Sequence, residues 1–379
     1  MRKDWETKKL NEISENLDSY RVPITKNIRT SGTIPYYGAS GIVDYVGDYI
    51  FDDELLLVSE DGANLLARTY PIAFSVKGKC WVNNHAHVLR FKDAATRTFI
   101  EYYLNAIGLE DFVSGMAQPK LNQAMLNKIP IPFPPLKEQK RIVSILDEAF
   151  AAIDKAKVNA EKNLVNAREL FEGYLQNVFE KKGEGWEEKT LGEIANVIGG
   201  GTPSKANKKF YDGDIHWATV RDMKGEIIIT TEYKITVDAV KNSSTNIIPK
   251  GNVIIATRVG LGKVCLNEND TAINQDLRGI VPINSKKLSV DFLYRWFKSV
   301  AHKIVEEGTG ATVQGVKLPF IKSLVIYVPT LKEQKTIVQK LDVLSKETKN
   351  LEIVYKEKIA SLEELRKSIL QKAFAGELT

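Results

Sequence analysis

The sequence has few of the residues that build disulfide frameworks or metal centres. Its 379 residues include only two cysteines, Cys80 and Cys265, and four histidines. The cysteines lie far apart in dissimilar contexts, so we expect two unpaired thiols in a reducing compartment. With so few ligands, a zinc-ribbon or multi-ligand metal site is nearly excluded. His85 and His87 could point the same way on a strand, but no further His lies near them, and we predict no metal site.

Long hydrophobic runs are also missing. No stretch of about 18 apolar residues is present to span a bilayer, and the N-terminal MRKDWETKKLNE is too polar for the apolar centre of a signal peptide. Apolar residues make up 43% of the chain and charged residues 27%, as in an ordinary globular protein. We therefore expect a cytoplasmic chain with no membrane partner.

Catalytic motifs are absent as well. The segment 199–205 superficially resembles a phosphate loop, but the G-x-x-x-x-G-K-[ST] spacing is not there, and the lysine of VGLGK at 259–263 is not followed by Ser or Thr. The chain has no Asn-Pro dipeptide, so the Asn-Pro-Pro-aromatic loop of adenine methyltransferases is missing, and no G-x-S-x-G elbow is found. The sequence predicts that this chain by itself is not an enzyme.

The net charge of +5 is small for a chain of this length. A protein that holds DNA by charge alone is far more basic, because each phosphate contact needs a basic group. If the chain binds nucleic acid, either its basic groups cluster on one face or a partner supplies much of the phosphate contact.

What the sequence does contain is a repeat of two unlike parts. LKEQKRIVSILD at 136–147 matches LKEQKTIVQKLD at 331–342 in nine of twelve positions, and WETKKLNEI from Trp5 matches WEEKTLGEI from Trp186 in six of nine. Each Trp leads into a non-helical region rich in β-branched and aromatic residues, which ends in a Pro-bearing apolar segment before the LKEQ helix. We predict four parts: a module over 1–135, a long helix over 136–182, a second module over 183–330 and a second helix over 331–379.

Both predicted helices carry an apolar stripe of mean period 3.5 over about six heptads, which is typical of a coiled-coil seam. Lys157, Thr348 and Lys358 interrupt it. A helix of about 44 residues and roughly 65 Å cannot stand alone in water, so we expect the two to pair antiparallel. The alternative is two separate helices, each packed on its own module. The predicted seam positions are Val143, Leu146, Phe150, Ile153, Leu164, Phe171, Ile337, Leu341, Leu344, Leu351, Leu362 and Ile369.

The two modules share a framework and differ in polar side chains. The buried strands expected at 54–59 and 252–257 are comparable, and each runs into a polar loop. WVNNHAHVLRF at 81–91 aligns with AINQDLRGIVP at 272–282. The alignment pairs Asn83 with Asn274, Asn84 with Gln275, His85 with Asp276 and His87 with Arg278. A shared scaffold with different polar tips is what two readers of different sequences need.

Several of these polar groups suit nucleic acid. Amides and guanidiniums can bond base edges, whereas Lys, Arg and Tyr suit phosphate and sugar. The candidate base contacts are Asn83, Asn84, Arg258, Asn274, Gln275 and Arg278, and His85 is a further candidate for DNA binding without an assigned role. The candidate backbone contacts are Tyr36, Tyr37, Lys77, Lys79, Lys205, Lys208, Lys209, Arg221 and Lys224. For each residue the alternative is a strand-end or turn side chain that caps its own backbone.

The alternating modules and the helices that begin PPLKEQKRIVSILD and PTLKEQKTIVQKLD resemble the specificity (S) subunits of type I restriction–modification systems. The resemblance covers essentially the whole chain and includes IPYYGASGIVDYV, EDGANLL and WVNNHAHVL in the first module. In the second it includes GGTPSKANKKFYDGDIHWATVRDM and INQDLRGI.

This resemblance implies a fold and a set of partners. The expected fold is α+β: two pseudo-symmetric target recognition domains with largely antiparallel sheets, alternating with two long helices that pair as an antiparallel coiled coil. Each domain would read one half of a bipartite site in double-stranded DNA, and the helices would space the domains and dock two methyltransferase (M) subunits. Motor-nuclease (R) subunits would join to form the restricting complex. S-adenosylmethionine, ATP and magnesium are expected on the partner subunits, and no cofactor is expected in this chain.

Two other interpretations stay open at this point. The chain could be a scaffold that bridges protein partners through its helices, or the specificity subunit of a system that methylates without cutting. The first predicts no salt-dependent DNA affinity. The second cannot be told from a restricting system by this sequence, because the nuclease would be on another chain.

Overall fold

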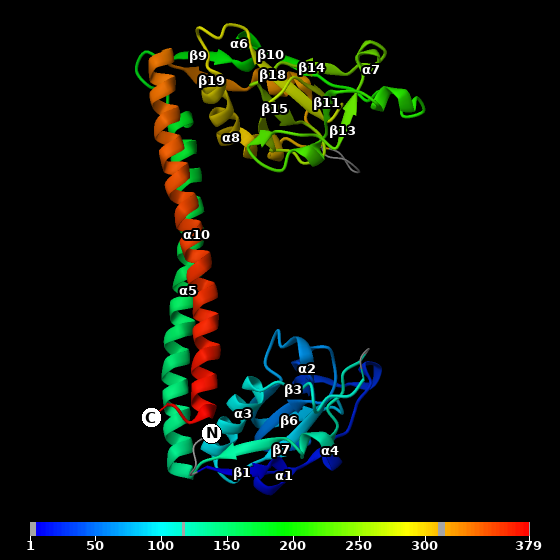
Figure 1. Ribbon diagram of the computed structural model, residues 1–379, viewed down its shortest axis with the longest axis vertical. Helices are drawn as coiled ribbons and strands as arrows, with labels where there is room; N and C mark the ends of the chain where they lie inside the picture. Colours follow the sequence, from blue (N-terminus) through cyan, green and yellow to red (C-terminus); the bar gives the residue numbers. More distant parts are fainter. Residues whose placement is uncertain (1–4, 116–117, 310–314, 379) are drawn as a thin grey trace. The chain divides into compact units, whose positions relative to one another are not determined.

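The chain divides into two units that each combine a module with parts of both long helices. The computed structural model describes residues 5–115, 118–309 and 315–378. Unit 1 comprises Met1–Glu161 with Lys356–Thr379, and unit 2 comprises Lys162–Tyr355. The long helices are α5 (Leu136–Glu180) and α10 (Leu331–Ala375), so each contributes one part to each unit (Figure 1).

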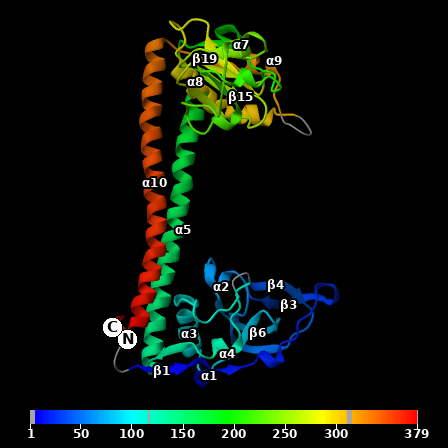
Figure 2. The same ribbon diagram turned by 45° about the vertical axis from the view of Figure 1, so that its right-hand side comes forward.

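A six-stranded sheet forms the centre of the module in unit 1, with strand order β2-β7-β5-β6-β3-β4. Its strands are β2 (Glu15–Asn16), β3 (Ser31–Gly38), β4 (Gly41–Val46), β5 (Phe51–Ser59), β6 (Ala73–Val82) and β7 (Ala86–Arg90). Only β3 and β6 pair in parallel among the described residues of this sheet. Helix α3 (Ala94–Ala106) lies between the sheet and α5 (Figure 2).

The module of unit 2 has two sheets, with strand orders β10-β18-β15-β16-β12 and β13-β11-β17-β14. The strands are β10 (Ala195–Gly199), β11 (Ile215–Ala218), β12 (Ile227–Ile228), β13 (Tyr233–Ile235), β14 (Asn246–Ile248), β15 (Val253–Ala256), β16 (Val264–Asn267), β17 (Thr271–Ile273) and β18 (Leu277–Pro282). Helix α8 (Val290–Glu306) packs on the first sheet and on the long helices. Antiparallel pairs dominate both modules, and the predicted α+β class is confirmed.

The two Trp-led segments form the same small structure. In unit 1, β1 (Glu6–Lys9) pairs with β8 (Pro130–Phe133) and leads into the short helix α1 (Leu10–Ile13). In unit 2, β9 (Glu187–Thr190) pairs with β19 (Val325–Val328) and leads into α6 (Leu191–Ile194). The Pro-bearing segments that precede the LKEQ helices are therefore the partner strands of the segments that begin each module.

The glutamine of each LKEQ motif anchors its helix to its own module. Gln139 is 1% exposed; its amide donates to the Pro134 carbonyl at 2.8 Å and accepts from the Thr96 hydroxyl at 2.7 Å. Gln334 is fully buried; its amide donates to the Pro329 carbonyl at 2.9 Å and accepts from the Ser289 backbone N–H at 2.8 Å. A buried amide needs all of these partners, so the repeated glutamine has a structural reason.

The two long helices run antiparallel. In unit 1, Arg366 Nη1 lies 2.7 Å from Asp154 Oδ1, and Lys157 pairs with Glu363. In unit 2, Arg168 Nε lies 3.0 Å from Glu352 Oε2. Each step forward along α5 is matched by an equal step back along α10, so the predicted antiparallel pairing is confirmed. Lys157 interrupts the stripe because it pairs with Glu363 across the two helices, and this hydrogen bond raises the pKa of Lys157.

The helices also pack on the modules, and each helix contributes to the cores of both units, so the alternative of two separate helices, each on its own module, is wrong. In unit 1, the predicted seam residues Leu146, Phe150 and Ile153 are buried, and Val143, Leu362 and Ile369 are partly buried against the same core. Phe374, near the end of α10, contacts Phe99 and Tyr103 edge to face, with ring centroids 5.3 and 5.1 Å apart. The C-terminal end of the chain thus completes the core of the N-terminal module.

In unit 2 some buried positions of the helix pair hold smaller residues than the predicted seam. Leu341 is fully buried, Phe171 and Ile337 pack on the same core, and Leu164 and Leu344 are half-buried. Leu351, however, is 41% exposed, so its place in the seam was predicted wrongly. The buried positions nearby are Ser345 and Thr348. Thr348 is tolerated because its hydroxyl donates to the Leu344 carbonyl at 3.0 Å, within the helix.

Two findings bear on the absences in the sequence. Across the described ranges, no helix is both long and apolar enough to cross a membrane. Cys80 and Cys265 are unpaired and buried in different units, as predicted, and burial raises the pKa of the Cys265 thiol to about 11.

Candidate nucleic-acid interface

Each module has a tight turn that joins two strands of its framework. In unit 1 the turn precedes β7, and Asn83 Oδ1 accepts a hydrogen bond from the His85 backbone N–H at 2.8 Å. In unit 2 it precedes β18, and Asn274 Oδ1 accepts from the Asp276 backbone N–H at 3.1 Å. Both asparagines are buried, with 7% and 6% of their surface exposed. Both side chains shape their turns, and their contact with bases stays a prediction.

The strand registers define which residues of the two modules are equivalent. Ser59 pairs with Ala86 at the end of β5, and Ala256 pairs with Leu277 at the end of β15. The next backbone N–H continues each pairing. In unit 1 the Glu60 N–H donates to the His85 carbonyl, and in unit 2 the Thr257 N–H donates to the Asp276 carbonyl. The predicted match of His85 with Asp276 is therefore confirmed. The loops shift by one residue relative to the sequence comparison, so that Asp61 corresponds to Arg258.

A further segment closes on each of these loops in the same way. Lys120 forms β-bridges with Asp61 and Ser114 in unit 1, and Gly315 forms β-bridges with Arg258 and Thr309 in unit 2. Both modules thus bring a strand-end turn, the loop after a central strand and a late segment to one edge.

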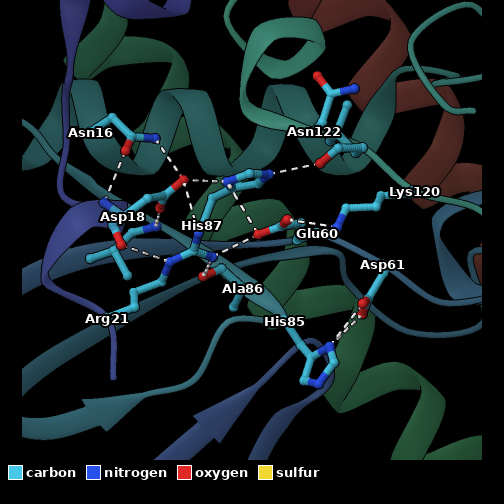
Figure 3. Close-up of polar contacts among 12 residues, drawn as sticks. Asn16, Asp18, Arg21, Glu60, Asp61, His85, Ala86, His87, Lys120 and Asn122 are labelled. Atoms are coloured by element: carbon cyan, nitrogen blue, oxygen red, sulfur yellow. Dashed lines mark hydrogen bonds and ion pairs between the residues drawn. The ribbon is translucent and has the colours of Figure 1, made fainter. Parts of the chain in front are cut away.

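Behind this edge, unit 1 contains a buried ionic network centred on His87, which is 1% exposed (Figure 3). His87 Nδ1 lies 2.6 Å from Asp18 Oδ2, and Nε2 lies 2.7 Å from the Leu121 carbonyl oxygen. Both partners of the ring are oxygen atoms that accept hydrogen bonds. Arg21 Nη1 lies 2.7 Å from Glu60 Oε2 in the same network.

The network lowers the pKa of both carboxyl groups. Burial alone raises the pKa of Asp18, but the hydrogen bond and charge of His87 outweigh it, and the pKa falls. The pKa of Glu60 is also lowered. Burial raises it, but Arg21, His87 and Lys120 together lower it by more. The ionic groups therefore join the segment around Asp18, the end of β5, β7 and the 120–121 segment into one support.

His85 and His87 have separate partners. His85 Nδ1 lies 2.8 Å from Asp61 Oδ2 at the surface, whereas His87 faces inward (Figure 3). In the part of the chain that the structure describes, no three His, Cys, Asp or Glu side chains gather as a possible metal site.

Unit 2 has a cavity of about 580 Å³ at the equivalent edge. Its aromatic wall consists of Tyr211, Trp217 and Tyr233, whose rings meet edge to face with centroids 5.9 to 6.3 Å apart. Predicted site residues also line it, namely Lys205, Lys208, Arg221, Asn274 and Gln275. Lys209 and Lys224 are exposed but outside the lining. The cavity thus brings amides and cations together, the groups that contact base edges and phosphates.

Other predicted residues of unit 2 are already engaged. The Gln275 side chain accepts a hydrogen bond from the Thr202 hydroxyl but remains exposed. Arg278 donates from Nη1 to the carbonyls of Gln275 and Leu277, at 2.9 and 2.7 Å. Burial and the neighbouring Arg258 lower the pKa of Arg278. Arg278 therefore holds the turn, whereas Arg258, with 48% of its side chain exposed, is open to a ligand.

In unit 1 the predicted residues divide between the edge and other places. Asn84 and His85 are exposed on the turn. Tyr36 is 1% exposed beneath Arg29, and Tyr37 packs against Phe74, so these tyrosines belong to the core rather than to a DNA-facing surface.

The two lysines of β6 are also not at this edge. Lys77 pairs with Glu54 at 2.7 Å, and Lys79 lies 4.4 Å from the centre of the Tyr49 ring. Both pair with the beginning of β5, at the opposite end of that strand from the turn. The structure does not bring them to the candidate interface.

Sequence reasoning missed the carboxylates and the aromatic wall. Asp61 and Asp276 each pair with a cationic candidate, at 2.8 and 3.6 Å. The position of these two aspartates near the turns can be read from the sequence. Which side chain each one pairs with depends on which loop lies beside which turn in the folded module. Trp217 and Tyr233 come from strands 16 residues apart in the chain, and nothing local links them to Lys205.

Comparison with known proteins gives a consistent result. The family model described as the type I restriction modification DNA specificity domain matches twice, over residues 2–163 and 183–361. A chain of Haemophilus influenzae assigned as a type I restriction enzyme specificity subunit is 31% identical over 89% of this chain and 86% of its own length. The EcoR124I/EcoR124II specificity subunit of Escherichia coli is 32% identical over 64% of this chain and 62% of its own length.

Solved structures share the fold. One, from work on complex assembly and conformational transition of the type I R-M system, has a TM-score of 0.74 at 20% identity and covers 100% of this chain and 99% of its own. The HsdS subunit of Thermoanaerobacter tengcongensis has a TM-score of 0.65 at 19% identity and covers 100% of this chain and 98% of its own.

Proposed function

Because the chain belongs to the type I restriction modification DNA specificity family, we propose that it reads a bipartite DNA site for partner subunits that carry out the chemistry. It is a type I specificity subunit with two target recognition domains. The observation that carries the proposal is the double family match: each copy covers one module together with the first part of the long helix that follows it. As a specificity subunit, the chain selects the sequence and is not itself the catalyst.

The edges described above are the proposed reading surfaces. In unit 2, Lys205, Lys208 and Arg221 around the cavity would hold phosphates, and Arg258 and Gln275 beside it would face base edges. In unit 1, Asn84 and His85 would face base edges. The modest net charge is consistent with partners that share the phosphate contacts.

The paired helices are the proposed docking surface for two methyltransferase subunits. In unit 2 they expose several large apolar side chains: Leu170 at 56%, Val343 at 58%, Leu351 at 41%, Ile353 at 53% and Val354 at 54%. Exposed apolar groups on a pair of helices favour burial against a partner. S-adenosylmethionine would bind the methyltransferase subunits, which methylate adenine N6, while ATP and magnesium would serve the motor-nuclease subunits of a restricting complex.

The direct test is sequencing of methylated DNA. Cells that express this chain together with its methyltransferase partner subunit are expected to carry N6-methyladenine in a bipartite motif. Cells that lack only this chain are expected to lose that motif completely. Single-molecule sequencing measures both and reads out the two half-sites. A folded, intact methyltransferase that leaves no such motif when this chain is present would contradict the proposal and favour a scaffold.

The helices are further proposed to set the distance between half-sites. Seven residues inserted in each helix at facing positions, after Lys157 and before Glu363, keep the seam in phase and add about 10 Å, the rise of roughly three base pairs. We expect the tolerated spacer to lengthen by about that amount while both half-sites stay the same.

A heptad inserted in α5 alone is the matched control, because it leaves the facing helix out of register and is expected to abolish methylation. If the double insertion methylates the original spacer as well as the wild type does, the helices do not determine the spacing.

A further inference from the structure

We propose that the pairs Asp61–His85 and Arg258–Asp276 are equivalent reading positions in which the carboxylate and the nitrogen-bearing side chain change places between the modules, and that this exchange makes the two half-sites differ. The inference rests on the proposed function, because it assigns a base-reading role within the same edges. The inference also predicts that the base read by Arg258 in the second half-site is a guanine.

The equivalence comes from backbone geometry. His85 and Asp276 are each the residue whose N–H bonds to the buried asparagine of the turn. Asp61 and Arg258 are each the residue of the facing loop that bridges to the late segment. The two pairs therefore connect the same two backbone positions, with the acidic residue on the loop in unit 1 and on the turn in unit 2.

Exposure follows the type of side chain rather than its position. In unit 1 the His85 side chain is 50% exposed and Asp61 is 18% exposed. In unit 2 the Arg258 side chain is 48% exposed and Asp276 is 17% exposed. In both pairs the carboxylate is the inner group, and the nitrogen-bearing side chain that it orients faces solvent.

The two exposed side chains differ in what they offer to DNA. With Nδ1 of His85 on Asp61, Nε2 can make a single contact. With Nη1 of Arg258 near Asp276 at 3.6 Å, the other nitrogens of the guanidinium can make a bidentate contact with guanine O6 and N7, the commonest specific contact in the major groove. Because the exposed side chain comes from the turn in unit 1 and from the loop in unit 2, the two modules place it over different base pairs of their half-sites.

A purely structural role would also explain the pairs, since each one ties a turn to a loop. Exchange of the two side-chain types within a pair separates the two roles. The double variants D61R/H85D and R258D/D276H keep a carboxylate opposite a nitrogen-bearing side chain at the same two positions but move the exposed side chain to the other element. A structural tie survives this exchange, whereas a reading group does not.

The experiment sequences methylated DNA from cells with the methyltransferase and each variant of the full chain. We expect D61R/H85D to change one base of the first half-site and R258D/D276H to lose guanine at one position of the second. Methylation rates at the old and new base should differ about 10- to 100-fold, as expected for the loss of one good base contact. The other half-site and the spacer should not change.

The matched control is D53R/R90D. Arg90 Nε lies 2.7 Å from Asp53 Oδ2, and this pair joins the same strands β5 and β7 at their opposite ends. Its exchange should leave the motif unchanged. Thermal unfolding of each variant shows whether a lost motif reflects a lost fold.

R258K provides a test that does not depend on the exchange. Lysine keeps the charge opposite Asp276 but has no planar fork, so guanine preference at that one position should fall by a similar factor. If folded R258K and folded exchange variants keep the wild-type motif, the inference is overturned. If the wild-type chain itself directs no bipartite motif, it is the proposed function that fails.

Discussion

Leu341→Asp is expected to lower the free energy of unfolding of unit 2 by more than about 4 kcal/mol, enough to remove its cooperative transition under ordinary conditions. Leu341 is fully buried in a core that also contains Phe292 of α8 and Phe179 of α5. An aspartate there loses the apolar contacts and places an unpaired carboxylate among hydrocarbon side chains. Chemical denaturation followed by far-UV circular dichroism measures the change.

Val343→Asp is the matched control, since Val343 lies two residues away on the same helix and is 58% exposed. Its unfolding transition should shift by less than about 0.5 kcal/mol. Because Val343 belongs to the proposed docking surface, this variant should instead weaken binding of the methyltransferase subunit. Equal stability of the two variants would show that the core at Leu341 has been assigned incorrectly.

His87→Leu is expected to destabilise unit 1 by about 3–5 kcal/mol, the usual cost of removing one partner from a buried ionic network. Leucine leaves Asp18 with a buried carboxylate that has lost its closest side-chain partner, and the Leu121 carbonyl loses its partner as well. Arg21 remains 3.5 Å from Asp18, which keeps the loss finite. Denaturant titration at pH 7 measures it.

The pH dependence of stability should change with it. In the wild type the pKa values of Asp18 and Glu60 lie below their ordinary values. Each carboxylate therefore contributes stability that is complete above its unfolded pKa, about 4, and is lost as pH falls through the lower folded value. Without His87 the effect of burial is less well opposed, so the loss of stability between about pH 5 and 2 should become shallower.

His85→Leu is the control for this prediction. His85 lies two residues away on the turn and its side chain is 50% exposed, so the free energy of unfolding should change by less than about 1 kcal/mol. The prediction for His87 fails if the two variants have the same stability and the same pH profile.

The helices were predictable because their signals are local. A stripe of apolar residues at steps of three and four and the repeated LKEQ start are read along the chain without knowledge of distant contacts. The structure has α5 over Leu136–Glu180 and α10 over Leu331–Ala375. Which side chains are buried was less predictable: Ser345 and Thr348 occupy buried positions and Leu351 does not.

The candidate site was also less predictable, because the burial of its side chains depends on contacts between distant segments. Asn83 and Arg258 are both polar residues near strand ends, yet one is buried in its own turn and the other faces solvent. Sequence chemistry alone treats them alike. The strand register and the late segments that close on the loops decide between them.

The sequence by itself determined the repeat of module and helix and the family to which the chain belongs, because these depend on periodicity and on matches along the chain. Only the tertiary structure decided which charges meet, that Asp61 corresponds to Arg258, and that Phe374 completes the core around Phe99. Those contacts join segments far apart in the chain, and their geometry results from the packing of whole sheets and helices, which no local pattern encodes.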